Sequence, residues 1–141
     1  MPMAPLHQLV EEVMNKGNLA AIDELLASDF QDEDVFPGLP PDTRESLKAF
    51  VTELRSAIPD LYFEPLDECQ IGDQCWGRYL LSGTMTGGPL FGQGPTGKRA
   101  ERVREMHRCH VNAQGLIDRH FGSGDDLGLF IQIGIKYPFP E

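Results

Sequence analysis

The stretch KRAERVREMHRCHVNAQGLIDRHFGSGDDLG, residues 98–128, decides the fold of this chain. It is predicted to form two long strands joined by a tight turn at 112–115, and side chains in 98–111 alternate between two faces. One face carries Val103, Cys109 and Val111, and the other carries Arg102, Arg104, Met106, Arg108 and His110. A straight strand of this length would extend about 45–50 Å, whereas a compact domain of this size has a radius of gyration of about 14 Å. The strand must therefore bend, and the sheet must be curved, with a concave face that side chains, helices or a ligand fill.

Length and charge limit the class of protein. The 141 residues predict a single domain, 1–141. The net charge of −10 and the pI of about 4.7 argue against nucleic acid and against an anionic membrane as partners. Three cysteines without a CxxC pair lack zinc-site spacing, so no metal is expected, and reduced thiols suit a cytoplasmic protein. No apolar run approaches membrane-spanning length, and the first residues do not have the form of a signal peptide.

The spacing of apolar residues predicts helices first and strands afterwards. Helices are expected at about 6–16, 18–26 and 42–58, an acidic Pro-rich loop at 31–42, strands at 61–71 and 74–86, and a short helix from Asp125 to Gly134 before the apolar tail 135–141. Asp42 and Glu45 have capping-box spacing at the start of the third helix. The predicted fold class is α+β, with three N-terminal helices packed on one face of a strongly curved antiparallel sheet. The other face is expected to be solvated or packed against a second copy.

Five segments occur in an order that covers nearly the whole chain. They are NKGNLAAIDELLASDF (15–30), ELRSAIPDL (53–61), LSGTMTG (81–87), PTGKR (95–99) and IDRHF…DDLGLFIQIG (117–134). This series resembles the SnoaL-like polyketide cyclases of the nuclear-transport-factor-2-like superfamily. The resemblance implies a cone-shaped, cystatin-like fold with a deep apolar pocket for a small hydrophobic ligand, and a homodimer formed through the outer sheet face. It also implies ring closure by intramolecular aldol condensation, with an acidic residue as general acid/base and without a metal or organic cofactor.

The resemblance places the pocket on the face of the hairpin that carries Arg108, His110 and His120. Histidine can exchange a proton with a ketone or its enol near neutral pH, and arginine can hold an enolate oxygen. We therefore predict His110 and His120 as proton-transfer groups and Arg108 as the group that stabilises the oxyanion. Asp32 or Glu33 is expected to orient one histidine. The predicted pocket walls are Met14, Phe50, Leu54, Tyr79 and Met85.

The sequence departs from the family pattern at several positions. Gly122 stands where the resemblance places the catalytic acid, and Asp32 is followed by Glu33 in place of an Asp-His pair. Asp118 or Asp125 can replace the acid only if the strand register slips. The residues also permit another interpretation, in which the polar face of the hairpin is the solvated face of a half-exposed sheet. His107, on the more apolar face, is expected to be structural.

Three hypotheses about function follow. The first is a cofactor-independent cyclase, isomerase or hydrolase that acts on a small hydrophobic carbonyl compound. The second is a non-catalytic domain for small-ligand binding or dimeric assembly that has lost the acid. A separate possibility is that the outer sheet face and the YPFP segment of the tail 135–141 bind a heteromeric partner. The third is an epoxide-hydrolase-like enzyme, which needs an Asp-Arg-Asp arrangement around a water, and for this only Arg108 is evident.

Overall fold

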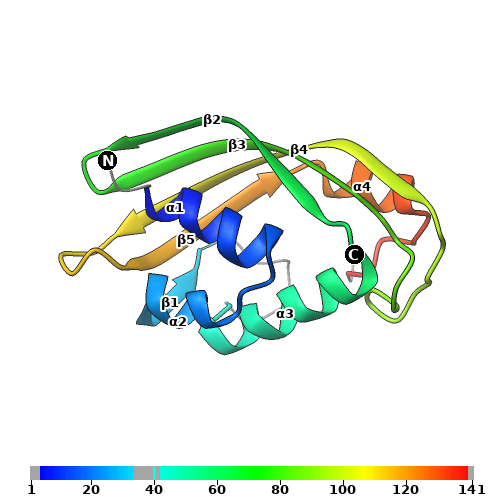
Figure 1. Ribbon diagram of the computed structural model, residues 1–141, viewed down its shortest axis with the longest axis horizontal. Helices are drawn as coiled ribbons and strands as arrows, with labels where there is room; N and C mark the ends of the chain where they lie inside the picture. Colours follow the sequence, from blue (N-terminus) through cyan, green and yellow to red (C-terminus); the bar gives the residue numbers. More distant parts are fainter. Residues whose placement is uncertain (1–3, 34–39, 41, 140–141) are drawn as a thin grey trace.

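A curved sheet with helices on one side organises the molecule (Figure 1). The computed structural model describes residues 4–33, 40 and 42–139. The strands are β1 (Leu26–Asp32), β2 (Tyr62–Ile71), β3 (Gln74–Thr84), β4 (Arg99–Val111) and β5 (Ile117–Gly124), and they pair in the order β1-β5-β4-β3-β2. The strand β1 runs parallel to β5, and the other neighbouring strands are antiparallel. The predicted α+β fold class is confirmed.

The helices cover the inner face of this sheet and one of its ends (Figure 1). They are α1 (Pro5–Gln8), which continues into the π-helical segment η1 (Leu9–Asn15), α2 (Ala20–Leu25), α3 (Arg44–Ala57) and α4 (Asp126–Ile133). The capping box of α3 is formed by Thr43 and Ser46, one residue later than the predicted pair. The start of α4 is as predicted, because the Asp125 carboxylate accepts a hydrogen bond from the Gly128 N–H. Among the described residues, no helix is both long enough and apolar enough to cross a membrane.

The strand β1 was not predicted, because its first residue was assigned to the preceding helix and its end to a loop. Its register with β5 shifts between Leu26 and Gln31, and this irregularity breaks the two-residue alternation expected of a strand. Leu26, Ala27 and Phe30 are buried whereas Ser28 and Asp29 are exposed, and buried residues at i, i+1 and i+4 are typical of a helix. The remainder of the predicted acidic loop, residues 34–39 and 41, lies outside the described residues.

The bend predicted for the long strand is confirmed. Arg102 in β4 has a φ of 54°, and the register with β3 shifts at this point. Ala100 and Val103, three residues apart, are therefore both buried on the inner face. The bend curves the sheet around the helices, so that the core and its cavities lie between the two layers.

The two faces of the sheet have different surroundings. The inner face packs with the helices into one apolar core that includes Val13, Ile22, Val51, Tyr79, Val103 and Ile133. The outer face exposes Trp76 and Met106. The predicted homodimer through this outer face remains a prediction. The described part of the tail packs inward, since the Phe139 ring lies 5.3 Å from the Phe91 ring and is 9% exposed.

Candidate functional site

Two adjoining cavities lie between the helices and the inner face of the sheet. The larger has a volume of about 190 Å³ and the smaller of about 110 Å³. Met14, Phe50, Phe63 and His107 line both of them. Of the predicted pocket walls, Met14, Phe50 and Leu54 line a cavity, Tyr79 lies beside His107 without lining either, and Met85 is buried elsewhere, under Gly94. The larger cavity also has two carboxyl groups in its lining, those of Glu105 and Asp126.

Glu105 and His107 point from β4 toward the larger cavity. They alternate in step with Val103 and Cys109, which are buried on the same face. The side chains of Glu105 and His107 are 11% and 19% exposed, and Glu105 Oε2 lies 3.7 Å from His107 Nε2. Two glycines of β5 make room for them: a Cβ atom at Gly122 would meet the His107 ring at 2.8 Å, and one at Gly124 would collide with the Glu105 carboxyl group.

Burial shifts the pKa values of these two side chains in opposite directions. It raises the pKa of Glu105 to about 8, with smaller contributions from the negative charges of Asp126 and Asp125. It lowers the pKa of His107 to about 3, with a smaller contribution from His120. The site therefore holds a carboxylic acid and an imidazole that are both predominantly uncharged near pH 7, although they lie side by side.

A chain of hydrogen bonds leads from His107 toward the edge of the sheet. His107 Nδ1 is 2.9 Å from His120 Nε2, and His120 Nδ1 is 3.1 Å from Asp32 Oδ2. The two imidazole rings stack with centroids 5.1 Å apart. Asp32 lies opposite His120 in the parallel ladder of β1 and β5. The structure thus brings together the predicted residues His120 and Asp32, and it adds His107, which was expected to be structural.

Arg108 and His110 lie on the outer face, and this corrects their expected placement in the pocket. Arg108 pairs with Glu33 at 2.5 Å and lies over the Phe121 ring, 5.1 Å from its centroid. The reason is strand alternation, because neighbouring residues of β4 point to opposite faces. With Arg108 outside the cavity, the described residues give no support to the arrangement that an epoxide-hydrolase-like reaction needs.

His110 has two acidic partners. Its Nδ1 is 2.5 Å from Asp118 Oδ1, and its Nε2 is 3.0 Å from Asp73 Oδ2. These hydrogen bonds, that with Asp118 first, raise the pKa of His110 above its ordinary value. Asp118 does not share the face of His120, since an irregularity in the β4–β5 register separates Ile117 from Arg119.

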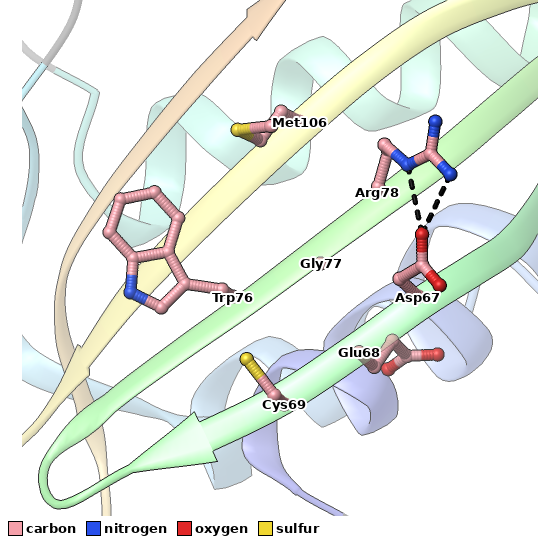
Figure 2. A pocket seen from close by; sticks show the side chains of 7 residues that line it. All are labelled: Asp67, Glu68, Cys69, Trp76, Gly77, Arg78 and Met106. Atoms are coloured by element: carbon pink, nitrogen blue, oxygen red, sulfur yellow. Dashed lines mark hydrogen bonds and ion pairs between the residues drawn. The ribbon is translucent and has the colours of Figure 1, made fainter.

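The outer face has a shallow groove of its own, of about 300 Å³ (Figure 2). Trp76, Met106 and the ion pair between Arg78 and Asp67 line it. The Arg78 guanidinium and the Asp67 carboxylate satisfy each other, so among its described lining residues this groove has no buried pair of titratable groups comparable to Glu105 and His107. We therefore take the inner cavities as the candidate site.

Glu105 and His107 are the two site residues that the sequence reasoning missed. The signal was present, because both share the alternation of Val103 and Cys109, the buried face of the strand. The resemblance placed an acid at position 122, but the His107 ring fills the space that a side chain there would need. Among the described residues, no group of three or more His, Cys, Asp or Glu side chains could hold a metal ion. The absence of a cofactor stays a prediction.

Comparison with known proteins shows the family and the fold of this chain. The family model for SnoaL-like polyketide cyclases matches residues 4–133. The structure of TsrD from Streptomyces laurentii is 25% identical, with 96% of this chain and 99% of that chain covered and a TM-score of 0.78. IdmH from Streptomyces antibioticus, named as a candidate polyketide cyclase, is 25% identical over 93% of this chain and 96% of that chain, with a TM-score of 0.75.

A more distant structure shares the fold alone. It is a protein from Catenulispora acidiphila with a ketosteroid isomerase-like fold, 13% identical, with both chains fully covered and a TM-score of 0.74. The search of curated proteins found no match.

Proposed function

This chain belongs to the SnoaL-like polyketide cyclase family, and from this premise we propose that it catalyses a cyclase- or isomerase-type reaction on a small hydrophobic carbonyl compound. The observation that supports the proposal is the pair of Glu105 and His107. A proton donor and a proton acceptor lie 3.7 Å apart at the wall of an apolar cavity, and burial keeps both uncharged at neutral pH. Strongly shifted pKa values in a cleft are typical of acid–base sites.

In the proposed reaction, His107 Nε2 removes a proton from the carbon next to one carbonyl group. That carbon attacks a second carbonyl carbon of the same molecule, and Glu105 donates its proton to the oxygen of the second carbonyl. The step leaves an imidazolium beside a carboxylate. The proton then returns from His107 to Glu105, because the pKa of Glu105 is the higher of the two. For an isomerisation, Glu105 protonates the oxygen of the first carbonyl and a conjugated enol forms; His107 then gives its proton to a different carbon of the enol, and the enol O–H proton returns to Glu105.

The walls of the cavities favour an uncharged, hydrophobic substrate. Phe50, Phe63, Phe91 and Phe130 line the larger cavity, and the smaller one is lined almost entirely by apolar side chains. Among the described lining residues there is no lysine or arginine, so a carboxylate ligand would meet Glu105 and Asp126 without a compensating cation.

Hydrogen–deuterium exchange next to the carbonyl of a small ketone tests the proposal. The probe is 2-tetralone in D₂O, followed by proton NMR, with the uncatalysed rate subtracted. Glu105→Gln and His107→Gln should each reduce the catalysed rate by about 10²–10⁴-fold, whereas His110→Gln, on the other face of the same strand, should leave it unchanged. The wild-type rate should fall as the pH rises past about 8, because Glu105 then loses the proton it donates.

Two results would overturn the proposal. One is a Glu105→Gln variant that exchanges as fast as the wild type. The other is a wild-type protein that binds the ketone without accelerating exchange, and this result would favour the non-catalytic binding domain.

A further inference from the structure

We propose that Asp32 is a positioning residue that, acting through His120, fixes the tautomer of His107 and leaves the Nε2 lone pair of His107 directed toward Glu105 and the cavity. The inference rests on the proposed function, in which His107 is the base. It identifies the nitrogen of His107 that acts as the base, and it identifies Asp32, two hydrogen bonds away, as the residue that keeps this nitrogen unprotonated.

The direction of the chain follows from the chemistry of its first member. An ionised carboxylate only accepts hydrogen bonds, so His120 Nδ1–H donates to Asp32 Oδ2 over 3.1 Å. A neutral imidazole has one N–H, and His120 Nε2 is then an acceptor. It accepts from His107 Nδ1–H over 2.9 Å. The remaining nitrogen, His107 Nε2, therefore has no proton.

The surroundings of His107 Nε2 agree with this assignment. The atom is buried and has no hydrogen-bond partner, and Oε2 of the Glu105 carboxyl group lies 3.7 Å from it. A buried N–H and a buried lone pair both cost free energy when they have no partner, so the chain of hydrogen bonds from Asp32 decides between them. A lone pair can receive a proton from a substrate carbon, and afterwards it can pass that proton to Glu105.

The backbone holds Asp32 in place for this task. Asp32 lies opposite His120 in the β1–β5 ladder, and the Glu33 N–H donates to the His120 carbonyl over 2.7 Å. The Asp32 N–H donates to the Asp42 carbonyl over 3.1 Å. The Asp32 side chain is 11% exposed and lines neither cavity. Hydrogen bonds join it to His107 through His120, and its negative charge also favours the imidazolium that forms during the reaction.

Nitrogen-15 NMR of the histidine rings tests the assignment directly. In the wild type at pH 8, above the ordinary histidine pKa of about 6.5, the Nδ1 atoms of His107 and His120 should both be protonated and both Nε2 atoms unprotonated. The variant Asp32→Ala removes the acceptor, so a protonated His107 Nε2 should appear. Ketone exchange should fall by about 10²-fold, as expected for a misplaced catalytic group.

Glu33→Ala is the matched control. It removes the neighbouring carboxylate, which pairs with Arg108 on the outer face, and it should change neither the nitrogen spectrum nor the exchange rate. A protonated His107 Nε2 in the wild type would overturn the inference, and this measurement does not depend on the folding of any variant. An unchanged nitrogen spectrum in Asp32→Ala would also overturn it. If the spectrum is as expected but Glu105→Gln retains full exchange, the proposed function fails and the tautomer assignment stands.

Discussion

The two faces of β4 both contain ionisable side chains, but two on the inner face are buried without a counter-charge and two on the outer face are paired with opposite charges. On the inner face, Glu105 and His107 are removed from water without a counter-charge, and burial moves each pKa toward the uncharged form. On the outer face, Arg108 has Glu33, and His110 has Asp118 and Asp73, so the charged forms are satisfied. The density of charged residue types is greatest on the outer face, but the side chains suited to proton transfer are on the inner one. Burial of an ionisable side chain without a counter-charge, more than its residue type, distinguishes a candidate functional site from an ordinary polar surface.

The largest expected effect is on the pH dependence of stability, and it concerns Glu105. Its pKa is about 8 in the folded protein, against an ordinary value of 4.5, so the unfolded chain ionises first as the pH rises. The contribution of Glu105 to stability should therefore be present in full below pH 4.5 and should decline between pH 4.5 and about 8, where it is lost. The full difference corresponds to about 5 kcal/mol at about 1.4 kcal/mol for each pKa unit.

Glu105→Gln should remove this loss, so that its free energy of unfolding, measured with urea between pH 5 and pH 9, declines much less than that of the wild type. Glu101→Gln provides the control, because Glu101 is exposed on the same strand and pairs with Arg99. If both variants show the wild-type slope, Glu105 is not held uncharged and the contrast between the faces disappears.

An intermediate effect is expected at Gly122, which makes room for His107. An added Cβ atom would lie 2.8 Å from Cε1 and Nδ1 of the His107 ring, so the ring must move. Gly122→Ala should cost about 1–3 kcal/mol of stability, the usual range for overpacking, and should break the hydrogen bond from His107 to His120. Urea unfolding and the His107 ring resonances measure the two effects.

The neighbouring variant Ser123→Ala serves as its control. Ser123 is exposed, and its substitution should change stability by less than about 0.5 kcal/mol. Equal costs for Gly122→Ala and Ser123→Ala would mean that the packing around His107 is loose.

Much of the fold could be predicted from periodicity. The change from helical to strand spacing after Pro59 and the bend in the long strand both follow from the residue pattern and the size of the domain. The strand β1 could not be predicted in the same way, because the register irregularity after Leu26 gives buried residues a helical spacing. Its parallel pairing with β5 joins residues about ninety positions apart, Asp32 and His120, which no local pattern reports.

The candidate site was predicted only in part, for a different reason. Alternation correctly separates His107 from Arg108 and His110, but the chemistry was assigned to the more polar face. The shared alternation of Glu105 with Val103 was available and would have pointed inward. The pKa values were not available, since they depend on burial and on Asp126, whose helix packs against β4. In the proposed function, Glu105 on β4 supplies the carboxylic acid that position 122 lacks.

The smallest expected effect is on the outer face, where salt should change the pKa of His110 but not that of His107 on the inner face. Asp118 and Asp73 raise the pKa of His110, so its contribution to stability is present below the unfolded value of 6.5 and is lost as the pH rises through the folded value. These groups are partly or largely exposed, and 1 M salt shortens the screening length to about 3 Å. In an NMR titration, the pKa of His110 should fall toward 6.5 in 1 M NaCl and in Asp118→Asn.

His107 should behave differently in the same experiment. Its low pKa results first from burial, which salt does not screen, so it should stay near about 3 in high salt and in Asp118→Asn. A His107 pKa that moves with salt as His110 does would mean that water and ions reach the inner face. Both faces of β4 would then be solvated surfaces, and the inner pair would no longer be kept uncharged by its surroundings.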